Sequence, residues 1–579
     1  MIPSIKRRNI GPDLNQKMAA LPDTLPAVIR QILASRGVAS ESDMNLEMGN
    51  LLSYTDLKDI ALGADIIEQA VISGQSVLVV GDFDADGATA TALTCLALRA
   101  FGLEQVDYLV PDRFTLGYGL SAALADIAIT KKPDVVITVD NGISSVEGIA
   151  ILQAAGVRVV VTDHHLPGAT LPNADAIINP NQAGCDFPSK AACGCAVAFY
   201  LMAAVRAKLL AQGWFAARSV PNLAEYLDLV ALATVADVVP FDRNNRILVH
   251  QGLLRIRAGQ ARPGINALLA VAGKAAPHLV GSDLGFAIGP RLNAAGRMED
   301  MSLGIACLMA ESEEEAQILA KQLDNLNKER RFVEQSMQEQ AKTLLDNFTD
   351  PATLPWGLCL FDADWHEGVI GILASRIKDR THRPVIAFAA SGDTEIKGSA
   401  RSINGFHLRD ALDLIATRHP GMLNRFGGHA MAAGLTIDRG DLMAFQSAFD
   451  QVVREQLTAD DLQAVMWSDG QLDGSELSLD MADQLQRIGP FGHHFPAPTF
   501  DGTFDIVDQR IVGQNHLKLV LSPIGTNQHI DAIVFNIDPA EWPTPHPQVC
   551  LRYQLDINRF RGNTSLQLMG DCLTAVATA

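Results

Sequence analysis

Two clusters of acidic and histidine residues are the part of the sequence best suited to chemistry. Asp82, Asp84 and Asp86 stand at alternate positions, and Asp163-His164-His165 is a consecutive run. Carboxylate and imidazole groups suit Mg²⁺ or Mn²⁺, and the histidines favour Mn²⁺. Two such cations can bind a phosphoester, acidify a water and stabilise the leaving oxygen. We therefore expect a metal-dependent phosphoester hydrolase.

Three short strands are expected to deliver these side chains to one place. Residues 76–80 precede the first cluster, Asp140 ends the run 134–139, and Asp163 follows the run 158–162. Ligands bind at the carboxyl edge of an open parallel sheet, where such strand ends meet. Carboxylates gathered there repel one another unless cations neutralise them.

Two simpler interpretations compete with a metal site at this edge. The segment Asp82–Gly87 looks like a calcium loop, but it follows a strand and lacks the final Glu of an EF-hand. An Asp after a strand is also often only the N-cap of the next helix. Three clusters at three strand ends favour a shared site.

The chain is long enough for three to four domains, since it has 579 residues. We predict an α/β fold with a parallel sheet, a long connecting helix, a second α/β domain and a C-terminal barrel-like β module. The helix is expected because residues 311–348 are amphipathic and contain no Gly or Pro. The expected boundaries are 1–50 (helical lead-in), 51–310, 311–348 (helix), 349–455 and 465–579 (β module).

Composition is that of a globular protein, with 48% hydrophobic and 19% charged residues. The net charge of -20 argues against a protein coated in nucleic acid, although a narrow basic channel remains compatible with it. Eight scattered cysteines favour a reducing, cytoplasmic location. Cys185, Cys193 and Cys195 do not form a standard zinc site, so we expect buried thiols. No apolar run approaches the ~18 residues needed to cross a bilayer.

Several motifs together resemble the DHH phosphoesterase family. The four successive family motifs are matched by Asp82-Phe83-Asp84-Ala85-Asp86-Gly87, Val139-Asp140-Asn141-Gly142, Asp163-His164-His165 and Ala236-Asp237. The subfamily of single-strand-specific 5′→3′ exonucleases is suggested by Pro111-Asp112-Arg113-Phe114, Gly117-Tyr118-Gly119, the stretch from Gly289 to Arg297, the stretch from Lys397 to Ser402, and Arg425-Phe426-Gly427-Gly428-His429. The resemblance covers nearly the whole chain from residue 50 onward.

The resemblance implies a two-metal site for Mn²⁺ or Mg²⁺. The implied ligands are Asp84, Asp86, Asp140, His164 and Asp237, with Asp82 close by. Asp140 is the candidate to bridge the metals, and His165 could contact the phosphate or orient a ligand. Some family members carry a His where this chain has Val80, so Asp82 or a water would fill that position.

The resemblance also implies loops that hold the substrate. Ser399 and Arg401 best match the loop that holds the 5′-terminal phosphate, and Gly398 would let the backbone approach it. The other implied substrate-binding residues are Arg113, Arg291, Asn293, Arg297, Gly427, Gly428 and His429. An arginine in general is more often a solvated surface residue.

The β module resembles the oligonucleotide-binding (OB) fold of this family, which combines a basic groove with aromatic platforms. Its candidate contacts are Lys518, Arg552, Arg559, Phe560 and Arg561. The implied activity is release of 5′-mononucleotides from single-stranded DNA during repair and recombination. The implied partner is single-stranded DNA, with a single-strand-binding protein and a helicase left open, and we expect a monomer.

Two other functions stay open from the sequence. A DHH hydrolase of short oligonucleotides or cyclic dinucleotides would generally lack the long helix and the β module. A non-catalytic binding protein with a relict DHH fold would have lost metal ligands, whereas this chain keeps every expected acid.

Overall fold

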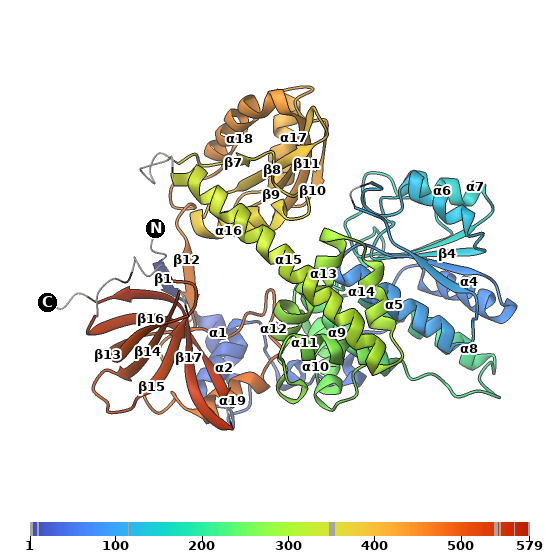
Figure 1. The fold of residues 1–579 in the computed structure, drawn as a ribbon. Helices are drawn as coiled ribbons and strands as arrows, with labels where there is room; N and C mark the ends of the chain where they lie inside the picture. The colour runs from blue at the N-terminus through green and yellow to red at the C-terminus, as the bar shows by residue number, and fades with distance from the viewer. Residues whose placement is uncertain are drawn as a thin grey trace. The chain divides into compact units, whose positions relative to one another are not determined.

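The computed structural model describes residues 4–8, 11–113, 115–346, 354–513, 515–537, 542, 546–560 and 562–576. The chain forms two compact units. One contains residues 1–7 and 328–468, and the other contains residues 8–327 and 469–579. We call them the small unit and the large unit and describe each by itself (Figure 1).

A five-stranded parallel sheet is the centre of the large unit. Its strands, in the order β3-β2-β4-β5-β6, are β2 (Val77–Val80), β3 (Val106–Leu109), β4 (Val135–Val139), β5 (Arg158–Thr162) and β6 (Ala176–Ile178). All five coincide with β-branched runs seen in the sequence, which confirms the predicted parallel sheet. Strands buried on both faces read as continuous apolar runs rather than as alternating ones.

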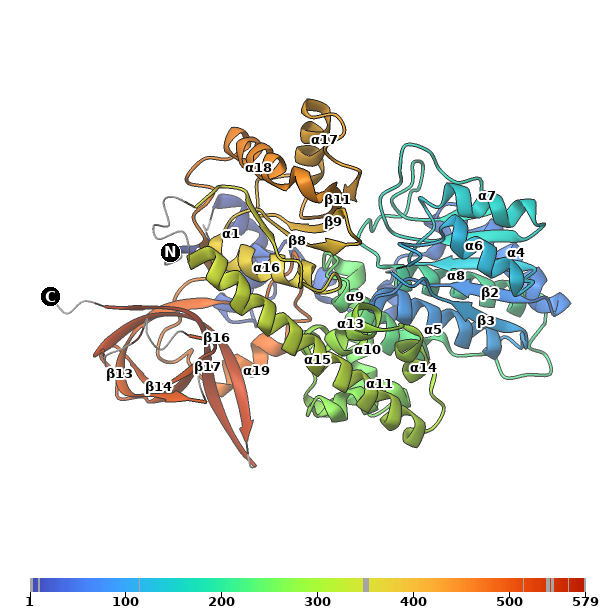
Figure 2. The ribbon, with the colours of Figure 1, turned by 45° about the horizontal axis from the view of Figure 1, so that its top comes forward.

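Helices cover both faces of this sheet (Figures 1 and 2). Val77 and Val79 of β2 pack into one core together with α4 (Ile60–Ser73), α5 (Ala85–Ala100) and α8 (Gly194–Ala211). Leu78 and Val80 point the other way, into a core with α6 (Ala122–Thr130) and α7 (Val146–Ala154). Because successive strand residues face opposite sides, one short strand contributes to both cores.

Helix α8 corrects the expectation that no apolar run of the sequence is long enough to cross a bilayer. It has 18 residues and a mean hydropathy of 1.5, so by length and composition it could cross a membrane. However, 67% of this window is buried, and the helix packs against α4 and α5. Its apolar character is therefore explained by a place in the core.

The rest of the large unit before residue 328 is helical. The N-terminal segment forms α1 (Pro12–Ala19), α2 (Ala27–Ser35) and α3 (Glu41–Met44). A cluster after the sheet consists of α9 (Leu227–Ala236), α10 (Arg243–Arg257), α11 (Pro263–Val271), α12 (Gly281–Asp283), the π-helical turn η5 (Leu284–Ile288), α13 (Gly289–Met298) and α14 (Ser302–Met309). Helix α9 packs against α5 and α10, so its C-terminal end is brought to the sheet edge.

Residues after 469 add a closed five-stranded barrel to the large unit. Its strands close in the order β13-β14-β15-β17-β16, and they are β13 (Phe500–Val512), β14 (His516–Pro523), β15 (Ile530–Val534), β16 (Gln548–Phe560) and β17 (Asn563–Ala575). The short helix α19 (Leu479–Arg487) contacts β16 and β17. The barrel expectation is confirmed, although the alternating runs of the sequence, at 504–507, 517–521, 530–536 and 550–558, match four of these strands and miss β17.

The small unit contains a mixed sheet in the order β10-β11-β9-β8-β7. Its strands are β7 (Leu358–Phe361), β8 (Val385–Ser391), β9 (Glu395–Arg401), β10 (Arg425–Gly428) and β11 (Ala432–Asp438), and its helices are α16 (Ile370–Thr381), α17 (Leu408–Arg418) and α18 (Leu442–Gln456). Only the pair β7 and β8 is parallel. In the same unit, β1 (Ser4–Arg7) pairs in parallel with β12 (Val465–Ser468), so the N-terminal segment is not wholly helical.

The predicted long helix is present as α15 (Glu313–Asp346), with 34 residues. At 1.5 Å per residue it is ~51 Å long. Its first part buries Ala320 and Leu323 in the large unit, and its last part buries Met337 and Ala341. It therefore belongs to both units.

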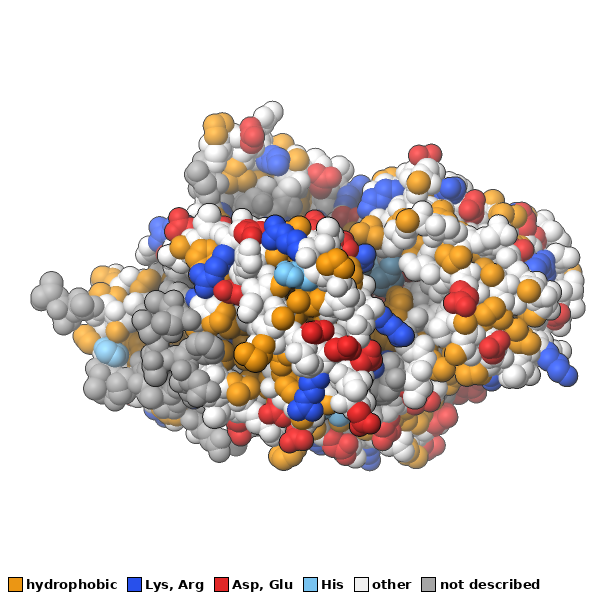
Figure 3. Space-filling model, turned by 90° about the horizontal axis from the view of Figure 1, so that it is seen from above, with side chains coloured by type: hydrophobic (Ala, Val, Ile, Leu, Met, Phe, Trp, Pro, Cys, Tyr) orange, Lys and Arg blue, Asp and Glu red, His pale blue; other side chains and the backbone are white. Residues whose placement is uncertain are grey.

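The cysteines are free, and the charged side chains on one face of the molecule are mixed in sign. All eight cysteines are free thiols, and Cys185, Cys193 and Cys195 are buried, as expected from their spacing. On the face drawn in Figure 3, the described Lys and Arg side chains are interspersed with Asp and Glu and form no continuous basic band.

Candidate metal centre

Six of the predicted ligands converge at the carboxyl edge of the parallel sheet. Asp82 and Asp84 follow β2, Asp86 lies in the first turn of α5, Asp140 follows β4, His164 follows β5 and Asp237 ends α9. Three overlapping groups have ligand atoms within 4.8 Å of one another, namely Asp82 with Asp84 and Asp140, Asp86 with His164 and Asp237, and Asp140 with His164 and His165. Four separate segments of the chain thus meet at one site.

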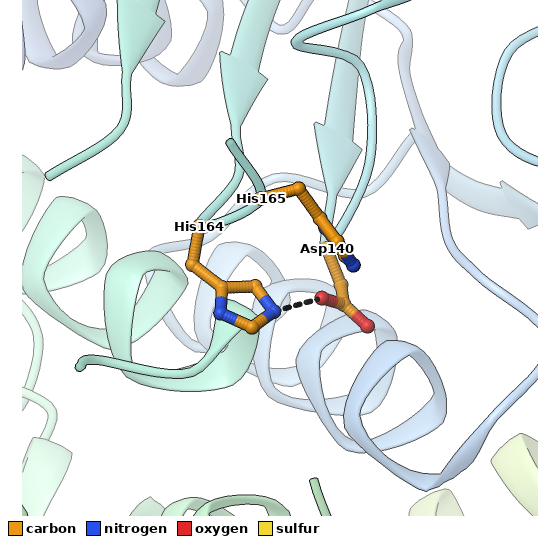
Figure 4. A group of neighbouring side chains, drawn as sticks. All are labelled: Asp140, His164 and His165. Carbon is orange, nitrogen blue, oxygen red and sulfur yellow. Dashed lines mark ion pairs between the residues drawn. The ribbon is translucent and has the colours of Figure 1, made fainter. Parts of the chain in front are cut away.

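The His164 imidazole lies among three carboxylates. Its Nε2 is 3.1 Å from Asp140 Oδ1, 3.5 Å from Asp237 Oδ2 and 3.8 Å from Asp86 Oδ2. Figure 4 shows His164 pointing at Asp140 from the end of the neighbouring strand, with His165 beside it. The Asn181 amide donates to the His164 carbonyl at 2.6 Å and so anchors the backbone of this residue.

Asp84 also serves as the N-cap of α5. Its Oδ1 accepts hydrogen bonds from the backbone amides of Asp86, at 2.9 Å, and Gly87, at 3.1 Å. The simpler interpretation of an Asp after a strand is therefore correct for one oxygen of this residue. The second oxygen is left for the acid cluster, because a carboxylate has two acceptor oxygens.

Asp86 is held by the start of another helix. Its Oδ2 accepts from the Gly194 amide at 2.7 Å, and its Oδ1 accepts from the Cys195 amide at 2.8 Å. These amides are the first donors of α8, whose N-terminus favours a negative charge. Residue 194 also approaches Asp140, since a Cβ built there would lie 2.5 Å from Asp140 Oδ1. A glycine is what this close approach allows.

Asp140 stands in a left-handed backbone conformation, with a φ of 61°. Asp tolerates this region better than most residues, because its short polar side chain can bond locally. The next residue, Asn141, is buried and donates from Nδ2 to the carbonyls of Val80, at 3.1 Å, and Val139, at 2.9 Å. This amide ties the end of β2 to the end of β4.

Asp163 orients the second histidine of the triplet. The Asp163 carboxylate accepts from His165 Nδ1 at 2.8 Å, from the His164 amide at 2.7 Å and from the Ile143 amide at 2.9 Å. Burial alone would raise the pKa of Asp163, but its hydrogen bond with His165 and the nearby histidines hold that pKa below its usual range. Burial opposes charge on His165, yet the Asp163 hydrogen bond prevails and raises the His165 pKa to about 9.

The remaining acids are difficult to ionise together. Burial is the main cause that raises the pKa of Asp82, Asp140 and Asp237 well above its usual value, and neighbouring carboxylates add to it. The same two causes raise the pKa of Asp86 to about 6. Asp82 Oδ1 is buried and accepts no hydrogen bond within the described part of the chain. Buried, mutually repelling carboxylate oxygens next to an imidazole are the donor set that divalent cations satisfy.

Helix α13 supports the loop that carries Asp82 and Asp84. Asn293 Oδ1 accepts from the Ala85 amide at 2.8 Å, and a Cβ on Gly296 would overlap the Phe83 carbonyl oxygen. Asn293 was predicted to bind substrate, and here it contacts the loop that bears the acids. Arg297 is partly buried in the last turn of the same helix.

Arg291 and Arg113 differ in their surroundings. Arg291 is paired with Asp324 through Nη2 at 2.8 Å and Nε at 2.9 Å, and its Nη1 donates to the Ala287 carbonyl. Arg113 lies over the Phe83 ring at 4.0 Å from its centroid, near Asp82 and Asp84. Burial lowers the pKa of Arg113, while these two acids raise it. Of the two guanidinium groups, only that of Arg113 lies at the acid cluster.

The other predicted substrate residues lie on the sheet of the small unit. Arg401 Nη1 donates to Ser399 Oγ at 3.1 Å, and no carboxylate pairs with Arg401 among the described residues. Burial lowers the pKa of this arginine. Gly371, in the first turn of α16, approaches both groups, because a Cβ there would lie 2.8 Å from Arg401 Nη2 and 2.9 Å from Ser399 Oγ.

Three glycines of this sheet have different surroundings. A Cβ on Gly398 would meet the Phe388 ring at 2.6 Å, so packing alone requires a glycine here, and the expected approach of its backbone to a phosphate stays a prediction. Gly428 has a φ of 132° and Gly427 lies in open space, both at the end of β10. The exposed His429 follows, and its amide donates to the Ala432 carbonyl at 2.8 Å.

Two of the cationic candidates on the barrel are already paired. Lys518 Nζ lies 3.1 Å from Asp531, and Arg552 pairs with Asp571. Arg559 lies near the end of β16. Arg561 and the side chain of Phe560 lie outside the described residues.

Sequence reasoning missed several residues of the site. Tyr118 was part of a quoted motif but received no role, and its hydroxyl donates to the Asp140 carbonyl at 3.3 Å and lies 3.2 Å from His165 Nδ1. Gly194 and Asn141 were not assigned either. The Gly-Tyr-Gly pattern could have indicated Tyr118, whereas no local signal marks Gly194, which is 108 positions from the aspartate it binds.

Comparison with known proteins places these features in context. Family models described as "DHH family, N-terminal domain", "DHHA1 domain" and "RecJ OB domain" match residues 76–234, 355–455 and 468–571. The single-stranded-DNA-specific exonuclease RecJ of Dickeya dadantii is 53% identical over 95% of this chain and 96% of its own length, and that of Escherichia coli is 51% identical over 98% of each. RecJ of Thermus thermophilus, solved in complex with Mn²⁺, superposes with a TM-score of 0.81 at 27% identity over 99% of this chain and 80% of that one. The Mg²⁺ complex of that protein gives a TM-score of 0.75 at 26% identity, over 100% of this chain and 78% of that one.

Proposed function

This chain belongs to the RecJ family of DHH phosphoesterases, and on that premise we propose that it is a single-stranded-DNA-specific exonuclease. The reaction is metal-dependent hydrolysis of phosphodiester bonds from the 5′ end, which releases 5′-mononucleotides. The proposed setting is DNA repair and recombination in the cytoplasm, with the protein acting as a monomer. The observation that carries the proposal is the convergence of five aspartates and one histidine from four segments at one sheet edge.

The ligands proposed for two Mn²⁺ or Mg²⁺ ions are Asp82, Asp84, Asp86, Asp140, His164 and Asp237. Their carboxylates fit cations because burial and mutual repulsion disfavour their charged forms when no cation is present. Asp140 is proposed to bridge the two ions. Its carboxylate belongs to two of the ligand groups, one with His164 and one with Asp82 and Asp84. When bound, such ions polarise the scissile phosphate, lower the pKa of a water and stabilise the leaving oxygen. Val80 is buried in β2, which leaves Asp82 as the nearby carboxylate on that side.

His165 is proposed to hold a proton next to the reacting phosphate. Burial opposes charge on this ring, but the hydrogen bond with Asp163, which fixes the ring through Nδ1, raises the His165 pKa. A charged imidazole can donate to a phosphate oxygen or to the departing oxygen. Tyr118 contacts the same ring and limits its orientation.

A second set of residues is proposed to bind the 5′-terminal phosphate. Arg401 is a partly buried cation without a carboxylate partner among the described side chains, and Ser399 Oγ lies 3.1 Å away. Both groups lie beside Gly371 in the first turn of α16, and the positive end of a helix dipole favours an anion. Arg113, Arg297, Asn293, Gly427, Gly428 and His429 stay proposed contacts to the strand. Arg291 remains a weaker proposal, because Asp324 already neutralises it.

The barrel supports a polymeric substrate rather than a dinucleotide. Closed five-stranded barrels of the OB type bind single strands through a groove and aromatic platforms. A relict, non-catalytic protein would have lost metal ligands, whereas this chain retains all six of the proposed ones. A single-strand-binding protein and a helicase remain proposed partners.

The test is digestion of single- and double-stranded DNA labelled at either end, with Mn²⁺ or Mg²⁺ added. We expect a 5′ label on a single strand to be released first as a mononucleotide, while a duplex persists. A 5′-labelled single strand that stays intact with both metals would refute the proposal. Equal rates on dinucleotides and long strands would instead favour a small-substrate hydrolase.

A further inference from the structure

The guanidinium of Arg113 has no polar partner within the described part of the chain. No carboxylate pairs with it there, and no acceptor takes a hydrogen bond from it. The contact that holds it is with the ring of Phe83, whose centroid lies 4.0 Å from the Arg113 Cζ. The residue is partly exposed, so a ligand can reach it. A guanidinium carries five N–H donors in a planar fork that suits a phosphate, and these donors remain available for an anion.

The segment that carries Arg113 gives it little support of its own. We call residues 110–121, which connect β3 to α6, the arginine loop. It contains no helix or strand among the residues that the structure describes. Two glycines with positive φ, Gly117 at 78° and Gly119 at 66°, turn the chain within it. A contact from outside the loop is therefore needed to fix the guanidinium in place.

Phe83 is held at its backbone and at its ring. Its carbonyl oxygen lies against Gly296, where an added Cβ would fall 1.8 Å from it. Its ring meets the Tyr118 ring edge-on, with the centroids 6.0 Å apart. The Tyr118 hydroxyl in turn lies 3.3 Å from the Asp140 carbonyl oxygen, to which it donates. The Phe83 ring thus contacts two residues of the arginine loop, Arg113 and Tyr118, and joins that loop to the segment that bears the acids.

We propose that Phe83 is a positioning residue, whose ring holds the Arg113 guanidinium beside the acid cluster so that it can bind the phosphate to be hydrolysed. The inference rests on the proposed function, since it takes Asp82 and Asp84, on either side of Phe83, as metal ligands. The face of an aromatic ring attracts a cation through its quadrupole and does not neutralise it. A carboxylate in the same place would occupy the donors and cancel the charge. One short segment would then supply both carboxylates for the metals and the support of a phosphate-binding cation.

The test compares kcat/KM on single strands for two variants of Phe83. Phe83→Leu keeps an apolar side chain but removes the ring face, and kcat/KM should fall ~3- to 30-fold, the range expected for a cation–π contact. Phe83→Tyr keeps the ring and should retain the wild-type value. Phe332→Leu is the matched control, because it makes the same change at a ring on α15 that is 76% exposed, and it should have no effect.

The decisive measurement is a double-mutant cycle with Arg113→Ala. Arg113→Ala alone should lower kcat/KM ~10- to 100-fold, as expected for the loss of hydrogen bonds to a charged group. If Phe83 acts through the arginine, Phe83→Leu should cause no further loss in the Arg113→Ala protein. An equal loss in both backgrounds would overturn the inference, since the ring would then act independently of Arg113. A general loss of stability in Phe83→Leu would also appear in both backgrounds.

Mn²⁺ binding to the metal-free full-length protein, measured by isothermal titration calorimetry, separates the ring from the ligands. Phe83→Leu should bind Mn²⁺ with the wild-type affinity, because the ring itself is no ligand. Weaker binding would show that the ring supports Asp82 and Asp84 rather than Arg113, and it would overturn the inference. A wild type that leaves single strands intact would refute the proposed function itself. Digestion that Phe83→Leu does not slow would overturn this inference alone.

Discussion

Gly194 lies so close to Asp140 that a Cβ on residue 194 would fall 2.5 Å from the Asp140 Cβ and Oδ1, while the Gly194 amide donates to Asp86 at 2.7 Å. One residue without a side chain therefore contacts two of the proposed ligands. Its amide holds one carboxylate, and its missing side chain makes room for the other.

Gly194→Ala should weaken Mn²⁺ binding and lower kcat by ~10- to 100-fold, the range found when a residue supporting a ligand is changed. The added methyl must displace the Asp140 carboxylate, because the Gly194 backbone is fixed at the start of α8. Calorimetry and single-turnover digestion measure the two effects. Gly49→Ala is the matched control, since nothing lies within 4 Å of a Cβ there. A Gly194→Ala protein with wild-type kcat would contradict the close approach.

Asp84→Ala and Asp237→Ala should each abolish hydrolysis while the fold is largely preserved. The metal-free Asp237→Ala protein should melt no lower than the wild type, because one of several repelling carboxylates is gone. Mn²⁺ should raise the melting temperature of the wild type far more than that of the variant. Calorimetric melting with and without Mn²⁺ checks this. The exposed Asp126→Ala should behave as the wild type in both measurements.

Mn²⁺ affinity should fall as the pH drops through about 6, where Asp86 takes up a proton in the metal-free protein. The pKa of Asp86 is higher in the folded than in the unfolded chain, so the folded state binds this proton more tightly. Its contribution to the stability of the metal-free protein is therefore favourable at low pH and is lost as the pH rises from about 4 to about 6.

Urea unfolding of the wild type and Asp86→Asn, both in chelator, isolates this contribution. The difference between the two should change between pH 4 and pH 6 and stay constant above pH 7. A difference that is the same at every pH would show that Asp86 does not titrate in this range.

Arg401→Ala should slow digestion of 5′-phosphorylated single strands by ~10- to 100-fold, since a hydrogen bond to a charged group contributes about 1.5–3 kcal/mol. Strands with a 5′-hydroxyl should be digested at a nearly unchanged rate. Digesting 5′-phosphorylated and 5′-hydroxyl strands together in one reaction gives the ratio of the two rates directly. Arg418→Ala removes an exposed arginine paired with Glu455 in the same unit and should change neither rate. An equal loss on both ends would count against a phosphate role for Arg401.

The parallel sheet could be predicted because its strands are buried on both faces and therefore read as unbroken apolar runs, such as Val159 to Val161. The strand β17 was missed because its burial is uneven and a glycine, Gly570, interrupts the pattern. Likewise, β10 carries two adjacent glycines, Gly427 and Gly428, so its sequence lacks the β-branched pattern of a strand.

The acids of the site were predictable because each follows a strand or ends an apolar helix. The residues that hold these acids in place could not be predicted. They come from remote segments of the chain, which local sequence patterns do not connect. Asn293, for example, accepts from the Ala85 amide, 208 positions away, and this supporting contact could not be predicted from the sequence. Arg291 stood in a loop-like motif, yet the fold supplies Asp324 as its partner.

Asn141 has a consequence for the free energy of folding. Because its amide joins the carbonyls of Val80 and Val139, the ends of β2 and β4 cannot spread apart independently. Asp82 and Asp140, which follow these strands, are therefore brought together by backbone contacts that need no ion. The free energy of folding bears the repulsion between these carboxylates, and a bound cation would relieve it.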